Sequence, residues 1–270
     1  MILFLFLPDI GFAQSAGAID LPETGQVTLQ SPGDDGAVKA GIEWPAPRFV
    51  VNTDTGTVID NLTGLMWLQN ANCLGGSNGA SYTTAKTNID SFNISPASFS
   101  CGGNQTFGNW HLPTITQLLS LININQSPLD TWLNAQGFTG VIRDDYWSLT
   151  ERSGSLPTSA WIVSMPNGST VIKSKASTID YVMAVRETDG DVPPPAPAPA
   201  NVWQTQAGSF NYGEEWPTPR FVTNTDDPFV EEGTIKDNLT GLIWLENAGC
   251  LTPELPSVTW EEALKAVKNF

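Results

Sequence analysis

The chain has 270 residues, enough for about two domains. Its 12 basic and 28 acidic residues give a formal net charge of −16, which excludes binding of DNA or RNA through a general basic field. No stretch is long and apolar enough to span a membrane. The acidic balance is typical of a soluble chain.

The first residues are predicted to direct export. Residues 1–13 form a secretory signal peptide in this interpretation, because residues 2–7 are continuously apolar yet too short to cross a bilayer. Gly11 and Ala13 supply the small residues that cleavage needs. We therefore expect a secreted or cell-surface protein. Residues 14–40, rich in Gly, Ser, Asp and Pro, are expected to be an extended lead-in.

A nine-residue stretch occurs twice and divides the rest of the chain. Residues 60–68 (DNLTGLMWL) recur as residues 237–245 (DNLTGLIWL), and the similarity extends to both sides. Such a self-match indicates tandem copies of one folding unit. We assign copy one to 41–187, a stiff Pro-rich linker to 188–205 and copy two to 206–270. Copy two lacks the second half of copy one, so the sequence is interpreted as a fragment.

Each copy is predicted to open with a hairpin followed by a buried strand. In copy one, two β-branched runs, 49–51 and 57–59, flank the turn residues Asp54-Thr55-Gly56. A second turn at 61–64 precedes the apolar run 65–68, which is typical of a strand buried on both faces. The acidic and amide side chains of both turns are interpreted as turn formers rather than calcium ligands, because they lack calcium-loop spacing.

Two helices are expected in copy one. The first is indicated by apolar residues at helical spacing: Tyr82, Ala85, Ile89 and Phe92. Copy two repeats this pattern from Trp260 onward. The second helix begins after a capping box formed by Thr114 and Gln117 and is predicted to run from Ile115 to about Asn123. Its buried residues are expected to be Leu118, Leu119 and Ile122.

The second half of copy one is predicted to be rich in strands. Strands are expected at 146–150, 160–163, 169–172 and 181–186, with Asn167-Gly168 as a hairpin turn. Trp67, Trp147 and Trp161 lie in apolar strand contexts and are predicted to be core residues. The fold class is therefore α+β.

Three cysteines agree with an exported protein. Cys73 and Cys101 flank the first helix of copy one, and a disulfide between them is the simplest pairing. Cys250 corresponds to Cys73, and its partner would follow Phe270.

Several of these motifs, in this order, resemble the Lcl C-terminal domain family, named after the Legionella collagen-like adhesin. The motifs are Thr-Gly-Leu-Met-Trp at 63–67, Asn-Trp-His-Leu-Pro-Thr at 109–114, Tyr-Trp-Ser-Leu-Thr at 146–150, Ala-Trp at 160–161 with Asn-Gly at 167–168, and Tyr-Val-Met-Ala-Val-Arg at 181–186. The resemblance covers nearly all of 41–187 and the first part of 206–270. His111 and Leu149 depart from it, where the family usually has Arg and Ser.

The resemblance implies an exported bacterial module. For the founding adhesin it implies binding of sulfated glycosaminoglycans and a trimeric assembly. A fold similar to the C-type lectin or formylglycine-generating-enzyme group is expected by a looser analogy.

The residues themselves give little support to catalysis. His111 is the single histidine, and we expect it to have a hydrogen-bonded structural role. An exported disulfide would leave no thiolate beside it. No phosphate-binding loop or clustered metal-ligand motif is present, so we predict no catalytic residues, no metal and no cofactor. Asp144 and Asp145 are interpreted as a solvated turn.

Ligand binding has more candidates. Lys173 and Lys175 alternate on a predicted strand and so share a face, and Arg143 and Arg152 lie in the same half. These cations could hold sulfate groups of a glycan. Trp132 is the candidate surface tryptophan for sugar stacking. Two functions stay open, a glycan-binding adhesion module and a structural or protein-interaction repeat whose partners are surface proteins.

Overall fold

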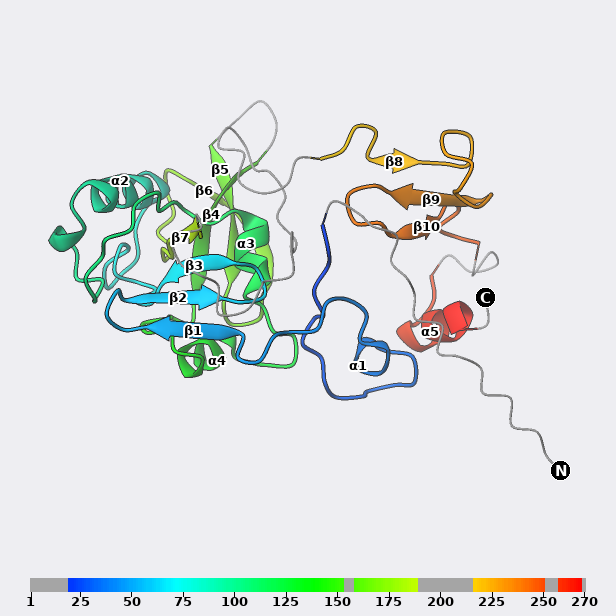
Figure 1. The fold of residues 1–270 in the computed structure, drawn as a ribbon, viewed down its shortest axis with the longest axis horizontal. Helices are drawn as coiled ribbons and strands as arrows, with labels where there is room; N and C mark the ends of the chain where they lie inside the picture. Colours follow the sequence, from blue (N-terminus) through cyan, green and yellow to red (C-terminus); the bar gives the residue numbers. More distant parts are fainter. Residues whose placement is uncertain (1–18, 153–157, 189–215, 251–256, 269–270) are drawn as a thin grey trace.

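The computed structural model describes residues 19–152, 158–188, 216–250 and 257–268. The predicted signal peptide and all but the first residue of the predicted linker lie outside the described residues. Within them the fold is α+β, with several antiparallel sheets and few helices (Figure 1). The helices of the described part are too short or too polar to cross a bilayer.

The N-terminal sheet has the strand order β1-β2-β3-β7, with every neighbouring pair antiparallel. Its strands are β1 (Phe49–Asn52), β2 (Thr57–Asp60), β3 (Leu65–Leu68) and β7 (Val185–Glu187). Both predicted turns are confirmed, and their glycines, Gly56 and Gly64, have φ of 63° and 70°. All of β3 is buried, as its continuous apolar run predicted.

The central sheet is a meander of β4 (Asp145–Glu151), β5 (Ser159–Ser164) and β6 (Thr170–Ser174). These strands match the predicted ones within two residues at either end. The turn between β5 and β6 contains Gly168 at a φ of 73°, as the Asn-Gly pair predicted. A register shift interrupts the β4–β5 ladder between Trp147 and Glu151.

The predicted strand at 181–186 is wrong as a single element. The backbone of Tyr181 bonds to the central sheet, because its amide donates to Asp145 and its carbonyl accepts from Trp147. Only Val185–Glu187 pairs with β3. The segment crosses from one sheet to the other, and apolar periodicity alone carries no information about which partner each residue takes.

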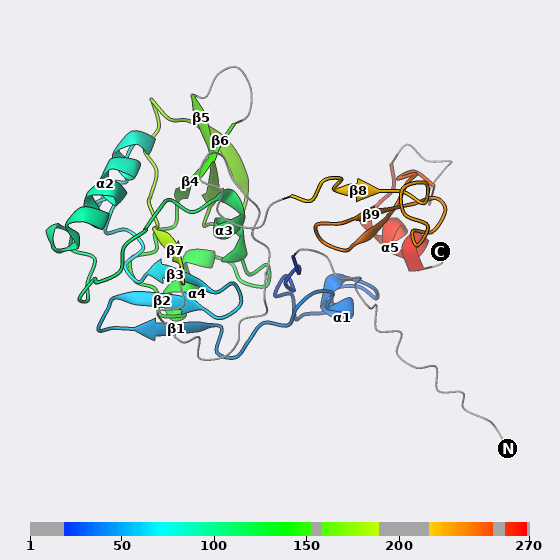
Figure 2. The same ribbon diagram turned by 45° about the horizontal axis from the view of Figure 1, so that its top comes forward.

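The first predicted helix is confirmed as α2 (Tyr82–Ile94), with Ser81 as its N-cap, and a short 3₁₀ turn (Pro96–Ser98) follows it. The four residues that predicted it are the ones it buries. In Figures 1 and 2, α2 lies at the far end of the molecule from the C-terminal residues.

The second predicted helix, α3 (Ile115–Ser120), has the complete Thr114–Gln117 capping box but ends earlier than expected. The amides of Leu121 and Ile122 bond three residues back instead of four, which closes the helix with tight turns. Leu118 is buried as predicted, but Leu119 and Ile122 are only partly buried.

Two helices were missed by sequence. α4 (Leu129–Ala135) begins after Pro128 and buries Leu129 and Leu133, whereas this segment was expected to be polar surface. The lead-in contains α1 (Asp35–Val38), capped by Asp34, so it is not extended throughout. Both helices are short, and short helices give weak periodic signals.

Strand β3 and residues 146–148 of β4 are buried on both faces between two apolar clusters. One cluster contains α2 with Met66, Leu68 and Trp147, and the other contains α3 and α4 with Trp67 and Tyr146. Trp67 and Trp147 are therefore core residues, as predicted. The prediction for Trp161 is wrong, because it faces away from its buried neighbours on β5 and is only partly buried.

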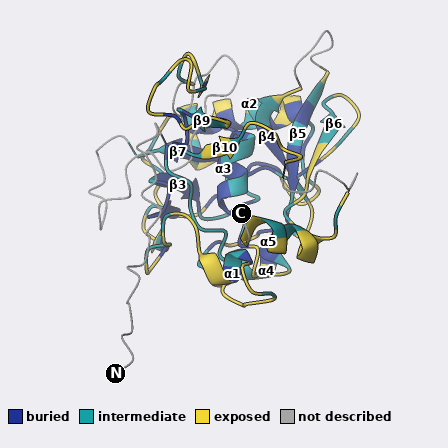
Figure 3. Ribbon diagram, turned by 90° about the vertical axis from the view of Figure 1, so that its right-hand side faces the viewer, coloured by how far each residue is buried: buried dark blue, intermediate teal, exposed yellow. Residues whose placement is uncertain are grey.

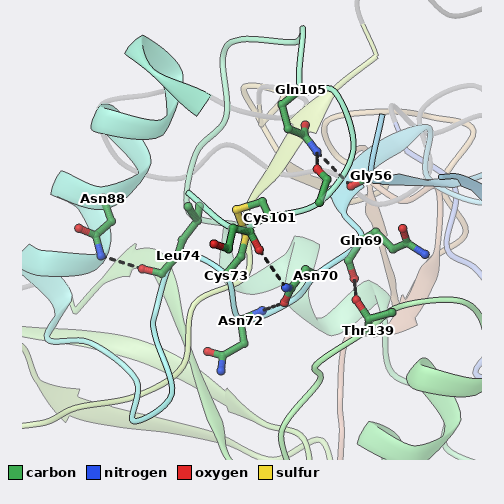
Figure 4. The surroundings of a disulfide bond; sticks show 12 residues. Gly56, Gln69, Asn70, Asn72, Cys73, Leu74, Asn88, Cys101, Gln105 and Thr139 are labelled. Carbon is green, nitrogen blue, oxygen red and sulfur yellow. Dashed lines mark hydrogen bonds between the residues drawn. A yellow bond between two sulfur atoms is a disulfide. The ribbon is translucent and has the colours of Figure 1, made fainter. Parts of the chain in front are cut away.

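The predicted disulfide between Cys73 and Cys101 is present and crosses 28 residues of sequence (Figure 4). Side-chain amides form hydrogen bonds that hold the surrounding loops in place. Asn88 of α2 donates to the carbonyl of Leu74 at 2.7 Å, and Gln105 donates to the carbonyl of Gly56 at 3.3 Å. The disulfide thus lies between α2 and the β1–β2 turn.

The C-terminal sheet consists of β8 (Phe221–Val222), β9 (Thr234–Asp237) and β10 (Ile243–Leu245), in the order β10-β9-β8. The helix α5 (Trp260–Lys268) follows, at the position the sequence predicted. The lead-in contacts the turn between β9 and β10, because the amide of Ile19 donates to the carbonyl of Leu239 at 2.8 Å. Exposed and partly buried residues predominate in β10 and α5, in contrast to the buried β3 and β7 (Figure 3).

Candidate functional site

Lys173, the first predicted sulfate ligand, is already held by two carboxylates. Its Nζ lies 2.6 Å from Asp145 Oδ2 and 2.5 Å from Asp180 Oδ1. Asp144 adds a third carboxylate, and these three acidic groups lie within 4.8 Å of one another. Burial raises the pKa of Asp180, against the opposing effect of Lys173. The surroundings of Lys173 carry more negative than positive charge, which favours a cation over a sulfate.

Lys175 and Arg143 are also paired. Lys175 Nζ lies 2.9 Å from Glu151 Oε1 and 5.1 Å from the ring centre of Tyr82, and Arg143 Nε lies 3.2 Å from Asp130 Oδ1. Arg152 is exposed and forms no ion pair with any residue that the structure describes. Three of the four predicted cations therefore have carboxylate partners of their own.

Trp132 is partly buried rather than a free stacking surface. Its ring lies 6.1 Å from the ring of Trp44 and 5.9 Å from that of Phe49, centre to centre. It belongs to an aromatic group at the edge of the α3–α4 cluster. Sequence placed it in a polar segment because α4 was not predicted.

A cleft of about 410 Å³ lies between α2 and the segment that leads to α3. Polar side chains from three separate parts of the chain meet in it, and apolar side chains form the rest of its lining. The polar residues are Lys86, Asp90 and Asn93 from α2, Asn109 and His111 from the segment before α3, and Glu187 from β7. The apolar residues are Ile89, Trp110, Leu112 and Leu149.

Helix α2 forms one wall of the cleft. Its buried residues occupy one stripe, so Lys86 and Asp90, which are four residues apart, project together beside that stripe. Asn93 fixes the opposite wall, because its side chain donates to the carbonyl of Trp110 at 2.8 Å and accepts from its amide at 2.9 Å. This pair of bonds holds the 109–112 segment at a set distance from α2.

Asn109 bends the backbone of the 109–112 segment. It has a φ of 62°, in the left-handed region that asparagine tolerates better than most residues. After the bend, His111 forms two backbone bonds with Val185, of 2.9 and 3.1 Å, which align the segment with β7. The side chains of His111 and Glu187 are thereby brought to the same end of the cleft.

His111 and Glu187 form a hydrogen-bonded pair. His111 Nε2 lies 3.3 Å from Glu187 Oε2, and Nδ1 lies 2.8 Å from the carbonyl oxygen of Leu112. Each ring nitrogen therefore lies within hydrogen-bond distance of an oxygen atom. Burial alone would raise the pKa of Glu187, but the hydrogen bonds from His111 and Gln117 outweigh it and hold that pKa below its usual value.

The predicted structural role of His111 agrees with this geometry, since its ring is buried and held on both sides. The other polar residues of the cleft were not singled out by sequence. His111 and Glu187 are 76 residues apart, and Lys86 and Asp90 resemble ordinary charges on an exposed helix. No local pattern could have connected them.

The sequence motifs between residues 63 and 186 resemble those of one family. Residues 56–186 match the family model of the Lcl C-terminal domain. The Lcl C-terminal match starts at the β1–β2 turn and ends in β7, so it includes every residue lining the cleft except Glu187. Lcl C-terminal domains are associated with adhesins and are not a known enzyme family. No curated protein sequence matches the chain.

Proposed function

We propose that residues 41–187 form a non-catalytic binding module of an exported bacterial protein, and that the cleft beside α2 binds a sugar unit of a glycan. In this proposal residues 206–270 begin a second copy of the module. The Lcl C-terminal match supports an adhesin-type role. The disulfide supports an oxidising location outside the cytoplasm.

The observation that carries the proposal is the convergence of polar groups from three parts of the chain in the cleft. The carboxylates of Asp90 and Glu187 accept hydrogen bonds from sugar hydroxyls, while Lys86 and Asn109 donate to them. The apolar lining provides a surface for the carbon skeleton of a ring. A volume of about 410 Å³ suits one or two sugar units rather than a long chain.

A binding role is favoured over catalysis because the reactive groups are occupied. Cys73 and Cys101 are joined to each other, and the ring of His111 is held by Glu187 and Leu112. Neither cysteine of this unit offers a thiolate for covalent chemistry.

Two alternatives have specific support. Sulfated glycans, which the resemblance to the Lcl family implied, would engage Arg152 and would have to displace the carboxylate partners of Lys173 and Lys175. A structural or protein-contact module would need no glycan at all, and the acidic surroundings of Lys173 favour it over the sulfated ligand. Trimeric assembly, also implied by the resemblance, would agree with either.

A glycan array probed with the full chain tests these options. We expect hits among neutral or mixed-charge glycans, with affinity weakened about tenfold by Asp90→Asn, since a hydrogen bond to a charged group contributes roughly 1.5–3 kcal/mol. Asn109→Gly removes the amide while keeping the left-handed backbone, and it should weaken binding similarly. Isothermal titration of each hit gives the affinities.

Asp54→Asn is the matched control, because Asp54 is an exposed acid in the β1–β2 turn, outside the cleft. If the hits are sulfated glycans and their binding is lost only in the double variant Lys173→Ala/Lys175→Ala, the binding site is the predicted face of Lys173 and Lys175 and not the cleft. An array without hits would favour the protein-contact module.

A further inference from the structure

Three aspartates gather around Lys173 at the edge of the central sheet. Asp144 and Asp145 lie where β4 begins, and Asp180 lies in the segment that leads from β6 to β7. One carboxylate oxygen of each aspartate lies within 4.8 Å of the other two. Lys173 contacts two of the three carboxylates. With all four groups charged, three negative charges meet one positive charge, and the group carries a formal charge of −2.

The backbone, and not the lysine, brings these aspartates together. Asp180 exchanges two backbone hydrogen bonds with Ala80, of 2.8 and 3.1 Å. The carbonyl of Asp145 accepts from the amide of Tyr181 at 2.8 Å, so the start of β4 and the segment around Asp180 are joined directly. The negative charges are therefore held close to one another by the path of the chain, at a cost in electrostatic repulsion that a bound cation would remove.

One buried oxygen of the group has no partner. The side chain of Asp180 is 2% exposed, and its Oδ1 accepts from Lys173. Its Oδ2 is also buried but accepts no hydrogen bond from any residue that the structure describes. A buried carboxylate oxygen without a partner is costly. Burial raises the pKa of Asp180, and Asp145 and Asp144 raise it further, against the opposing effect of Lys173. One lysine therefore does not compensate this carboxylate.

The chemistry and the spacing of the three carboxylates select the kind of cation. Carboxylate oxygens are ligands for hard divalent cations, and Ca²⁺ binds them at about 2.3–2.6 Å. One Ca²⁺ ion can therefore contact oxygens that lie up to about 5 Å apart, which includes the 4.8 Å found here. Mg²⁺, with distances of about 2.1 Å, spans only about 4.2 Å and requires nearly ideal octahedral geometry. The spacing favours Ca²⁺.

We propose that Asp144, Asp145 and Asp180 form a calcium site, in which the ion replaces the ammonium group of Lys173. The side chain of Lys173 is 26% exposed and flexible, so its charged end moves into solvent when the ion enters. Water completes the coordination, since Ca²⁺ takes roughly six to eight oxygen ligands. Competition with an internal cation limits the affinity, and we expect a Kd on the order of 0.1–1 mM, as in extracellular calcium modules.

Isothermal titration of the full, non-reduced chain with CaCl₂ at constant ionic strength tests the site. Lys173→Met keeps an unbranched side chain but removes the competing charge, and it should tighten Ca²⁺ binding roughly tenfold. Asp180→Asn should weaken it roughly tenfold or more. Asp144→Asn changes an exposed side chain, so the chain folds, and it should weaken binding as well. MgCl₂ should bind more weakly than CaCl₂ to the unchanged chain.

Two control variants separate this site from general attraction of Ca²⁺ to an acidic chain. Lys175→Met removes the neighbouring lysine of β6, which pairs with Glu151, and should leave the Ca²⁺ affinity unchanged. Asp54→Asn removes one exposed negative charge elsewhere, as Asp144→Asn does at the site, and should also leave it unchanged. Thermal melting without Ca²⁺ checks that each variant is folded.

The proposal is overturned if Asp144→Asn and Asp54→Asn change the Ca²⁺ affinity equally, because the ion would then respond only to the overall charge. It is also overturned if Lys173→Met does not tighten binding, because Lys173 would then not compete for the same oxygens. These measurements involve none of the residues that line the cleft, so they do not depend on glycan binding.

Discussion

Arg48 and Asp60 form a bidentate ion pair inside the N-terminal sheet, with N–O distances of 3.0 and 2.9 Å. Their side chains are 5% and 0% exposed. Asp60 also accepts from the amide of Leu62 and the hydroxyl of Thr63, so one carboxylate organises the turn between β2 and β3. The repeated sequence around Asp60 was predicted to form a turn. Because the charge of Asp60 is buried, it requires a charged partner, and Arg48, which precedes the strand, is that partner.

Arg48→Ala is expected to lower the free energy of unfolding of this unit by about 3–5 kcal/mol, because it leaves the carboxylate of Asp60 buried without its partner. Urea denaturation followed by tryptophan fluorescence measures the loss. Arg220→Ala is the matched control in the C-terminal sheet, where the arginine side chain is 24% exposed. It should leave the transition of the N-terminal unit unchanged. A loss below about 1 kcal/mol for Arg48→Ala would contradict the argument.

At the scale of elements, the sequence correctly predicted the features that are determined by residues close together in the chain. The capping box at Thr114, the turn glycines and the stripe of α2 each depend on residues a few positions apart, and each was placed correctly. The early end of α3, the presence of α4 and the division of the 181–187 segment depend on contacts between distant residues. The cleft is a product of such contacts, and for that reason the sequence placed His111 in a motif without showing that Glu187 and the polar residues of α2 would lie beside it.

The disulfide is the element-scale feature with the clearest energetic consequence. Because it closes a loop of 28 residues in sequence, the double substitution Cys73→Ser/Cys101→Ser should cost roughly 3 kcal/mol of unfolding free energy, mostly through the unfolded chain. Thermal melting of both proteins tests this. Thiol labelling without reductant should find one reactive cysteine per chain, the exposed Cys250. Three labelled thiols in the native chain would contradict the bond.

At the scale of the whole molecule, sequence indicated two related units, and their cores differ in size. The unit around β3 and β4 has two large apolar clusters, while the buried apolar residues described in the C-terminal part are Val222, Val230 and Leu239. Matching sequence therefore gives matching turns and ion pairs without a matching apolar core. Core size depends on the segment that covers the sheet, and no property of the repeated residues encodes it.

This difference predicts unequal protection of two strands with the same local design. β2 (Thr57–Asp60) and β9 (Thr234–Asp237) are both central strands that end in the paired aspartate. Opening of β9 exposes little apolar surface, so its amides should exchange roughly a hundredfold faster than those of β2 or more. Hydrogen exchange on the full chain alone measures both strands in one sample. Equal protection would contradict the prediction, since it would require the C-terminal sheet to have a core as extensive as that of the N-terminal unit.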